Sequence, residues 1–235
     1  MDSFSYNNIF ETKGIEYLAI IAFFAILVPF WMMLNKEVKV SRHIKNLGRL
    51  TLNALNIPQG LLFSKNHTWT FLEKSGLAQV GVDDLLLHIT GKVNYKNLKE
   101  PGDKIKKGDL LAEIESNGKL LRISSPVSGE IMDINSILGK TPGTLNEDPY
   151  QKGWMYKVKP SGWASETNSY YLADEATDWA AKELVRFKDF IAASVGKYSP
   201  EVTKVVLQDG GEMIDRTLSE MPEEVWNDFQ KNFLT

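Results

Sequence analysis

The sequence predicts a mainly β domain that is preceded by a membrane-spanning helix and followed by α-helices. Three observations predict this arrangement. Residues 17–34 form an uncharged and nearly all-apolar run, and short alternating runs between turn residues fill most of the middle of the chain. Apolar residues spaced three to five apart then recur near the C-terminus. The expected boundaries are 1–14 for a short extracytoplasmic tail, 15–34 for the helix, 35–66 for a basic stem, 67–162 for the β domain and 163–235 for an acidic helical extension.

Composition excludes several kinds of site. The chain has 235 residues and no cysteine, which rules out disulfides, thiolate nucleophiles and cysteine-ligated metal or iron–sulfur sites. Its three histidines lie far apart in sequence, so no metal site is predicted. The formal net charge is −3, and fourteen acidic against seven basic residues from Trp163 onward leave the front part basic. No basic stripe interleaved with aromatic residues is present, so nucleic acid is not an expected partner.

The apolar run predicts a single transmembrane helix over residues 15–34. About 20 apolar residues are needed to cross the hydrocarbon core. Tyr17 and Trp31 lie near the two ends, where aromatic rings favour the headgroup region. Acidic residues before the run and bulky ones at its end disfavour a cleaved signal peptide. Basic residues mostly follow the run, so the positive-inside rule predicts a membrane protein whose C-terminal domain is cytoplasmic.

The middle of the chain predicts a small all-β domain, because its strand-like runs recur between turn signals. Asn117-Gly118 is the pair most typical of a two-residue hairpin turn. Asp83-Asp84, placed before a run of leucines, predicts a short helix with an acidic N-cap. The predicted strands are Thr68–Leu72, Ala78–Val82, Gly91–Tyr95, Leu110–Ser116, Leu120–Ser124, Gly129–Ile134 and Trp154–Val158.

These segments resemble the glycine cleavage system H proteins. His67-Thr68-Trp69 and then Val80-Gly81-Val82-Asp83 look like the opening motifs of that family. Residues 98–109 are similar to its Leu-Pro-Glu-x-Gly segment. The resemblance continues through Glu113-Ile114-Glu115-Ser116, residues 123–131, Asn135, residues 146–150 and Gly153-Trp154. It runs in order over about 95 residues.

The resemblance implies a barrel-sandwich hybrid fold of the biotinyl/lipoyl-carrier type. In this family a lysine at a hairpin tip carries lipoate in amide linkage, and the flexible arm visits partner enzymes that supply the catalytic groups. The sequence has no Ser-His-Asp order, no glycine-rich phosphate loop and no paired-histidine metal motif. We therefore expect a carrier or binding module with no catalytic residues of its own, rather than an enzyme.

The hairpin departs from the family at its lysine. The family's tip reads Glu-Ser-Val-Lys-Ala, whereas this chain reads Glu115-Ser116-Asn117-Gly118-Lys119. Alignment without a gap puts Gly118 at the position of the lipoyl lysine and Lys119 one residue later. A type I′ turn would make Asn117-Gly118 the tip and would pair Ser116 with Lys119. Because successive strand side chains point to opposite faces, Lys119 would then leave from a flank of the hairpin.

Two interpretations follow, and we favour the first. In the first, the attachment site is lost, no cofactor is carried, and the chain is a membrane-anchored, non-lipoylated adaptor or subunit of a larger complex. In the second, Lys119 still carries lipoate and shuttles an aminomethyl group or electrons. Its protein partners would be the glycine cleavage enzymes or a membrane-associated redox complex. The simplest alternative for Lys119 is a solvated hairpin lysine.

Other conspicuous residues are expected to be structural. Trp69 should pack in the core, and His67 beside it should not be catalytic. His88 follows a leucine run and is expected to be a satisfied residue at a helix end. Glu113 and Glu115 alternate along one strand, so both should lie on one solvated face.

The C-terminal extension is predicted to be helical. Apolar spacing predicts an amphipathic helix over about Asp174–Val195, with Gly196 at its end. Ser199-Pro200-Glu201 and Met221-Pro222 are typical of further helix starts. The aromatic residues of the last helix, such as Trp226, are expected to pack back on the β domain, with a docking surface for a partner as the alternative.

Overall fold

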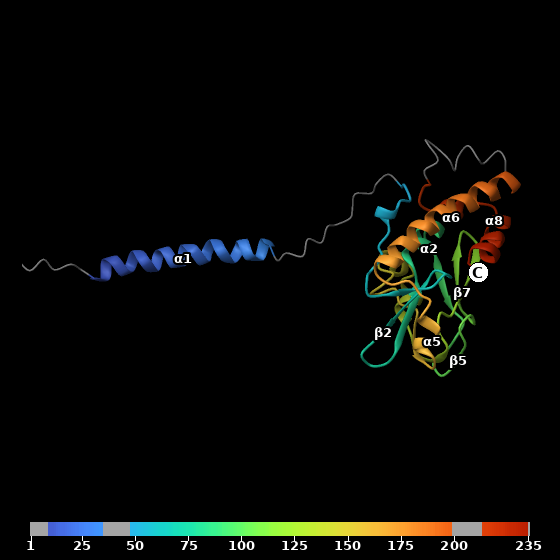
Figure 1. Cartoon of the computed structure of the whole chain (residues 1–235), viewed down its shortest axis with the longest axis horizontal. Helices are drawn as coiled ribbons and strands as arrows, with labels where there is room; N and C mark the ends of the chain where they lie inside the picture. The colour runs from blue at the N-terminus through green and yellow to red at the C-terminus, as the bar shows by residue number, and fades with distance from the viewer. Residues whose placement is uncertain (1–8, 35–47, 199–212, 235) are drawn as a thin grey trace, which may run out of the picture. The chain divides into compact units, whose positions relative to one another are not determined.

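The computed structural model describes residues 9–34, 48–198 and 213–234 (Figure 1). The chain divides into two compact units, Met1–Lys45 and Asn46–Thr235. The first contains α1 (Ile9–Leu34), a single helix of 26 residues with Pro29 inside it. Apolar side chains along α1, among them Phe23 and Phe24, are exposed.

The transmembrane helix predicted for residues 15–34 is not supported by the structure. Within the three described ranges, none of the helices combines the length and the apolar character needed to cross a membrane. The first eight residues of α1 include Glu11, Lys13 and Glu16. Most of the basic residues expected in the stem lie in 35–47, outside the described residues.

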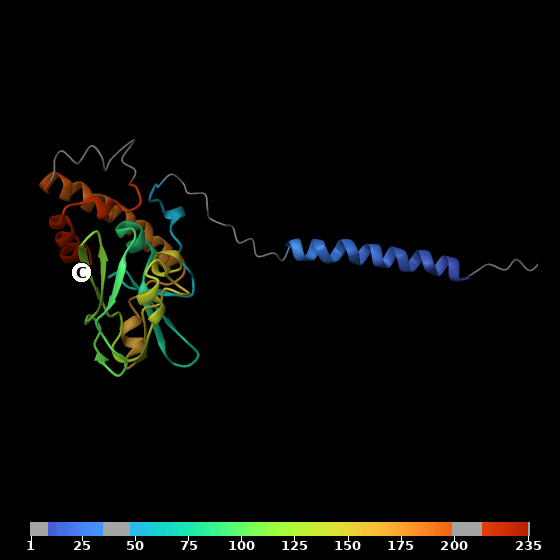
Figure 2. The ribbon, with the colours of Figure 1, turned by 180° about the vertical axis from the view of Figure 1, so that it is seen from behind.

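The second unit is built on two antiparallel sheets, as the sequence predicts for a mainly β domain (Figures 1 and 2). The larger sheet has the order β1-β2-β3-β9-β8-β5, and the smaller one has the order β4-β6-β7. The strands are β1 (Leu62–Phe63), β2 (Thr68–Leu72), β3 (Ala78–Val82), β4 (Asn94–Asn97), β5 (Lys104–Ile105), β6 (Leu110–Ser116), β7 (Lys119–Ser124), β8 (Gly129–Ile134) and β9 (Tyr156–Pro160).

Four strands have the predicted bounds, and the main discrepancy has a clear cause. The strand predicted to begin at Gly91 begins at Asn94 instead. Gly91 ends the preceding helix α2 (Asp84–Thr90), because it adopts a φ of 73° and donates its N–H to the carbonyl of Leu87. A glycine in this conformation is a common way to end a helix. At the other end of α2, Asp83 accepts a hydrogen bond from the backbone N–H of Leu86, so the predicted N-cap is confirmed.

The helix α2 and the long helix α6 (Asp174–Tyr198) lie at the same end of the sheets (Figures 1 and 2). The helix α6 continues past Gly196, where the sequence predicts its end. The hydroxyl of Tyr198 donates to Asp228 at 2.8 Å, and this tertiary contact holds the last turn. The helix start predicted at 199–201 lies outside the described residues. The remaining helices are η1 (Leu52–Ala54), α3 (Ser136–Lys140), α4 (Thr144–Glu147), α5 (Trp163–Thr167), η2 (Thr217–Glu220), α8 (Glu223–Asp228) and η3 (Phe229–Phe233).

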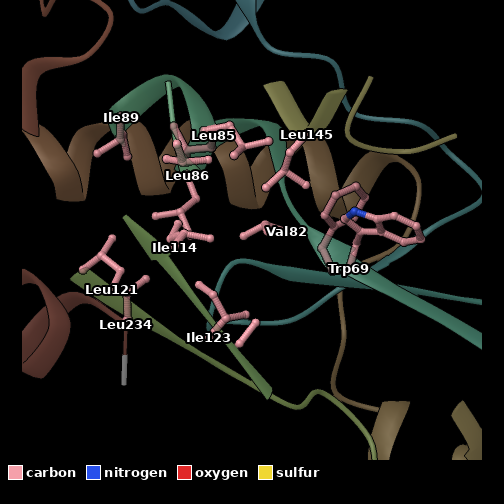
Figure 3. Close-up of a cluster of buried hydrophobic side chains, with 14 of the residues drawn as sticks. Trp69, Val82, Leu85, Leu86, Ile89, Ile114, Leu121, Ile123, Leu145 and Leu234 are labelled. Carbon is pink, nitrogen blue, oxygen red and sulfur yellow. The ribbon is translucent and has the colours of Figure 1, made fainter. Parts of the chain in front are cut away.

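Side chains from both sheets, from α2 and from the C-terminus share one core (Figure 3). Trp69 is fully buried, as predicted. Its indole lies so close to Gly81 that a Cβ atom there would come within 2.5 Å of the ring nitrogen. Leu234 is buried and belongs to the same core cluster as Leu121 of β7. The core therefore includes residues from well beyond the β domain.

The C-terminal helices pack back on the β domain, as predicted. Phe187 of α6 contacts Phe229 and Phe233, with ring centroids 5.8 and 5.7 Å apart. Trp226 of α8 is buried against β7. Aromatic rings at such distances stabilise the packing beyond the area that they bury.

Candidate functional site: the hairpin and its C-terminal lid

The β6–β7 hairpin has the predicted tip. Ser116 pairs with Lys119, and Asn117 and Gly118 form the turn between them. Both turn residues have positive φ, 51° and 77°, as a type I′ turn requires. A Cβ atom added at Gly118 would meet nothing within 4 Å, so the tip is open. Gly118, where the resemblance predicts the family's lipoyl lysine, therefore projects from the domain without a side chain.

Lys119 is not the solvated lysine that its place beside the turn would suggest. Its side-chain ammonium donates hydrogen bonds to the backbone carbonyls of Ser219, at 3.0 Å, and Met221. The nitrogen also lies 5.7 Å from the centre of the Trp226 ring, within the range of a cation–π interaction. All three partners belong to residues 213–234, which fold over this flank of the hairpin and which we call the C-terminal lid.

The lid also covers the free edge of β7. The backbone N–H of Arg122 donates to the side-chain oxygen of Gln230 at 2.6 Å, and the carbonyl of Arg122 accepts from the side-chain nitrogen at 3.3 Å. β7 lies at the edge of its sheet, where unpaired backbone groups invite pairing with another chain. The amide of Gln230 thus bonds to the edge of β7 as a neighbouring strand would.

A second set of contacts holds the start of the lid. The N–H of Leu50 donates to the carbonyl of Met213 at 2.8 Å, and the N–H of Arg216 donates to the carbonyl of His88 at 2.7 Å. His88 Nδ1 lies 2.9 Å from a carboxylate oxygen of Asp215. Burial alone lowers the pKa of His88, but hydrogen bonds to Asp215 and Asp84 outweigh burial and raise it to about 10. His88 is therefore a satisfied residue at a helix end, as predicted, and it is protonated at neutral pH.

His67 is structural, as predicted. It is fully buried between the rings of Trp179 and Phe233, with Nδ1 2.8 Å from Asp83 and Nε2 3.5 Å from Glu183. Burial lowers the pKa of His67, but the charges and hydrogen bonds of Asp83 and Glu183 raise it to about 9. The imidazolium therefore links the β domain to α6 and to the end of the lid.

The two strand carboxylates do not form a catalytic pair. Glu113 and Glu115 are half-buried on the same face of β6, and Glu113 lies 3.8 Å from the exposed Lys96. In the part of the chain that the structure describes, no group of three or more His, Cys, Asp or Glu side chains is placed to hold a metal ion. The feature of this region that the family resemblance singles out is the hairpin and its lysine.

Comparison with known proteins identifies the fold's family. The model of the glycine cleavage H-protein family matches residues 61–183. The chain belongs to this family. It is 39% identical over 105 residues to the probable glycine cleavage system H protein of Thermococcus gammatolerans, covering 45% of this chain and 78% of that protein. It is 36% identical over 141 residues to the mitochondrial glycine cleavage system H protein of Flaveria pringlei, covering 60% and 84%.

Among solved structures, this chain is similar to a glycine cleavage system H protein from Mycobacterium marinum, with a TM-score of 0.42 and 27% sequence identity. The match covers 45% of this chain and 87% of that protein. H proteins are carriers without catalytic activity of their own, so the prediction that this chain is not an enzyme is confirmed through the family. The family match includes the hairpin and ends before the C-terminal lid. The lid is therefore an addition of this chain to the matched region.

Sequence reasoning missed the contacts between the lid and the hairpin. The lid contacts the hairpin through the backbone carbonyls of Ser219 and Met221 and through the side-chain amide of Gln230. Groups of this kind produce no recognisable pattern in a sequence. Trp226 is the one available signal. An aromatic residue on an amphipathic helix indicates packing, but it does not say against which surface.

Proposed function

We propose that this chain is an H-protein-family module that acts by binding protein partners and does not carry lipoate while its lid is closed. The observation that carries the proposal is the state of the Lys119 amine, which donates to the carbonyls of Ser219 and Met221. An amide-linked arm needs an amine that an acyl group can reach and a position from which the arm can swing. Gly118 lies at the open tip of the hairpin but has no amine to which an arm could be attached. Lys119 has a side-chain amine, but hydrogen bonds to the C-terminal lid hold it in place. The residues of the hairpin therefore do not fit an attached lipoyl group in this conformation.

The role that follows is that of an adaptor or subunit of a larger assembly. A carrier fold whose arm is lost retains surfaces shaped for protein partners. Leu120, on the outer face of the hairpin, is 56% exposed although it is apolar. A single exposed leucine is ordinary on a protein surface, so the adaptor role rests on the family's fold and on the state of Lys119.

The second candidate is a lipoylated carrier that uses Lys119 and serves glycine cleavage or a membrane-associated redox complex. The comparisons favour this candidate more directly than the first, because the relatives described above are glycine cleavage system H proteins. The family match also spans the hairpin, and Lys119 is the lysine of that hairpin. This candidate requires the lid to leave Lys119 before an acyl group is attached.

Mass spectrometry of the protein from its native cells distinguishes the two candidates. Trypsin cleaves after unmodified Lys119 but not after an acylated lysine, so cleavage there reports the state of the amine. We expect cleavage after Lys119 and no peptide that carries a lipoyl mass. The control is a second lipoyl protein from the same cells, which must be fully modified. A lipoyl mass on Lys119 would contradict the non-lipoylated adaptor and would favour the lipoylated carrier.

Membrane association stays a prediction of the sequence. The exposed apolar side chains of α1 motivate it, and the predicted localisation is a membrane with the C-terminal domain in the cytoplasm. Fractionation of native cells tests this localisation. We expect the chain to sediment with membranes, whereas recovery of the chain in the supernatant would contradict the prediction.

A further inference from the structure

A small hollow lies beside the C-terminal end of α2, and we call it the α2 hollow. Its volume is about 190 Å³, which is the space of about six water molecules. Three separate segments of the chain contribute five charged side chains and one amide to its walls: Asp84, His88, Lys92, Asn146, Asp215 and Arg216. Charged groups that converge in so small a space need partners, so the partners of each group decide what the hollow can bind.

The two carboxylates of the α2 hollow have partners within the protein. The two ring nitrogens of His88 face them, with Nδ1 2.9 Å from Asp215 and Nε2 3.5 Å from Asp84. Asp84, which is 8% exposed, also accepts a hydrogen bond from the backbone N–H of Asn56 at 2.7 Å. The imidazole and one backbone N–H therefore offset the acidic side of the hollow.

The two remaining cations have no such partners. Lys92 and Arg216 are exposed, and neither side chain donates a hydrogen bond to, or forms an ion pair with, any residue in the part of the chain that the structure describes. An arginine side chain offers five N–H donors and a lysine side chain three. With His88 protonated, three cations face two carboxylates, so the hollow has a net charge of +1. What it lacks is a group that accepts hydrogen bonds and carries negative charge.

The fold fixes the position of the Arg216 side chain. The backbone of Arg216 has a φ of 67°, which is unfavourable for a residue other than glycine and persists where surrounding contacts enforce it. One such contact is the hydrogen bond from its N–H to the carbonyl of His88 at 2.7 Å. Its side chain lies against Gly91, where an added Cβ atom would come within 2.7 Å of the Arg216 Cγ. The guanidinium is therefore directed to the wall of the hollow by the backbone on both sides.

We propose that the α2 hollow binds a small oxyanion, a phosphate or carboxylate group, between Lys92 and Arg216. The planar guanidinium can donate two parallel hydrogen bonds to such a group, and the ammonium adds a compact positive charge. The inference goes beyond the proposed function, because Lys119 takes no part in it. Lys92 lies within the region that matches the family, whereas Arg216 belongs to the C-terminal lid. The site is therefore a property of this chain's added segment, and the bound group bridges that segment to the β domain while the lid stays docked.

Isothermal titration calorimetry of the full-length protein in a mild detergent tests the site. Inorganic phosphate and sodium acetate are the two ligands, and sodium chloride at equal ionic strength is the control for charge screening. We expect one site per chain for phosphate or acetate and no binding of chloride. Tighter binding of phosphate assigns the site to phosphate groups, and tighter binding of acetate assigns it to carboxylates. Binding of neither, or equal heats with chloride, would overturn the proposal.

Three variants locate the binding. Arg216→Gln removes the guanidinium and keeps the methylene groups that lie against Gly91, and it should weaken binding about tenfold or more, since hydrogen bonds to charged groups are lost. Lys92→Gln should weaken binding as well. Arg122→Gln is the matched control, because it removes an exposed guanidinium from β7, and it should bind as the wild type does.

Thermal unfolding without ligand checks that the variants fold, and each should unfold at the temperature of the wild type because its changed side chain is exposed. Unchanged affinity in Arg216→Gln would overturn the proposal. An equal loss of affinity in Arg122→Gln would also overturn it, because binding would then follow total charge. None of these results depends on the state of Lys119, so failure of the oxyanion site is distinct from failure of the proposed function.

Discussion

Restoring a lysine at the tip of the hairpin tests the proposed loss of the attachment site. The substitution is Gly118→Lys. Gly118 has a φ of 77°, and a Cβ atom added there meets no atom within 4 Å. The cost is therefore backbone strain alone, about 1–2 kcal/mol for a residue other than glycine in the left-handed region. For a unit of this size that corresponds to a decrease in Tm of roughly 2–8 °C.

The same substitution should create a reactive amine. The new lysine projects from the open tip and lies outside the hydrogen bonds that hold Lys119. In a reaction with a lipoate–protein ligase, lipoate and ATP, we expect the variant to take up lipoate at residue 118 while the wild type takes up little or none. Gly76→Lys is the matched control, because Gly76 also has a positive φ and open space around its Cβ position. It should lose similar stability and gain no lipoate.

Two results would contradict an open tip that has lost its lysine. A loss of stability well above about 3 kcal/mol would mean that the tip is packed rather than open, since strain at one residue costs of order 1–3 kcal/mol. Equal lipoylation of the wild type and the variant would mean that a lysine at residue 119 is presented as well as one at residue 118.

Three further predictions concern the core and the lid. Gly81→Ala places a Cβ within 2.5 Å of the Trp69 ring and should cost about 1–3 kcal/mol or more, measured by denaturant unfolding; a loss below 0.5 kcal/mol would contradict the close contact. Because its pKa is raised to about 9, His67 should contribute stability that is complete below its unfolded pKa of about 6.5 and is lost as the pH rises through 9. Thermal unfolding between pH 6 and pH 10 measures this loss, and stability that rises over this range would contradict it. Gln230→Ala should lower stability by about 0.5–1.5 kcal/mol, as expected for partly exposed hydrogen bonds, and no change would mean that its pairing with Arg122 adds nothing.

Much of the β domain could be predicted from the sequence, because its signals are local. Alternating apolar residues place the strands, and Asn117-Gly118 specifies both the turn and the register of the hairpin, since few other pairs allow two positive φ angles in a row. The end of α6 could not be predicted. Gly196 predicts the end of the helix, but the hydrogen bond from the Tyr198 hydroxyl to Asp228 stabilises a further stretch of helix beyond Gly196.

The state of Lys119 could not be predicted for a related reason. Its partners Ser219 and Met221 lie about 100 residues away in sequence and contribute only backbone carbonyls. Each residue has a backbone carbonyl, so sequence pattern does not distinguish these two from others. The family resemblance marks the hairpin as the site, and only the fold shows that another part of the chain occupies it.

The mass of the hairpin peptide from native protein tests most directly whether Lys119 carries lipoate. We expect an unmodified Lys119, cleaved by trypsin, in cells where other lipoyl proteins carry their cofactor. A lipoyl group on Lys119 in most molecules would contradict it, and would make this chain a carrier whose lid opens for its arm.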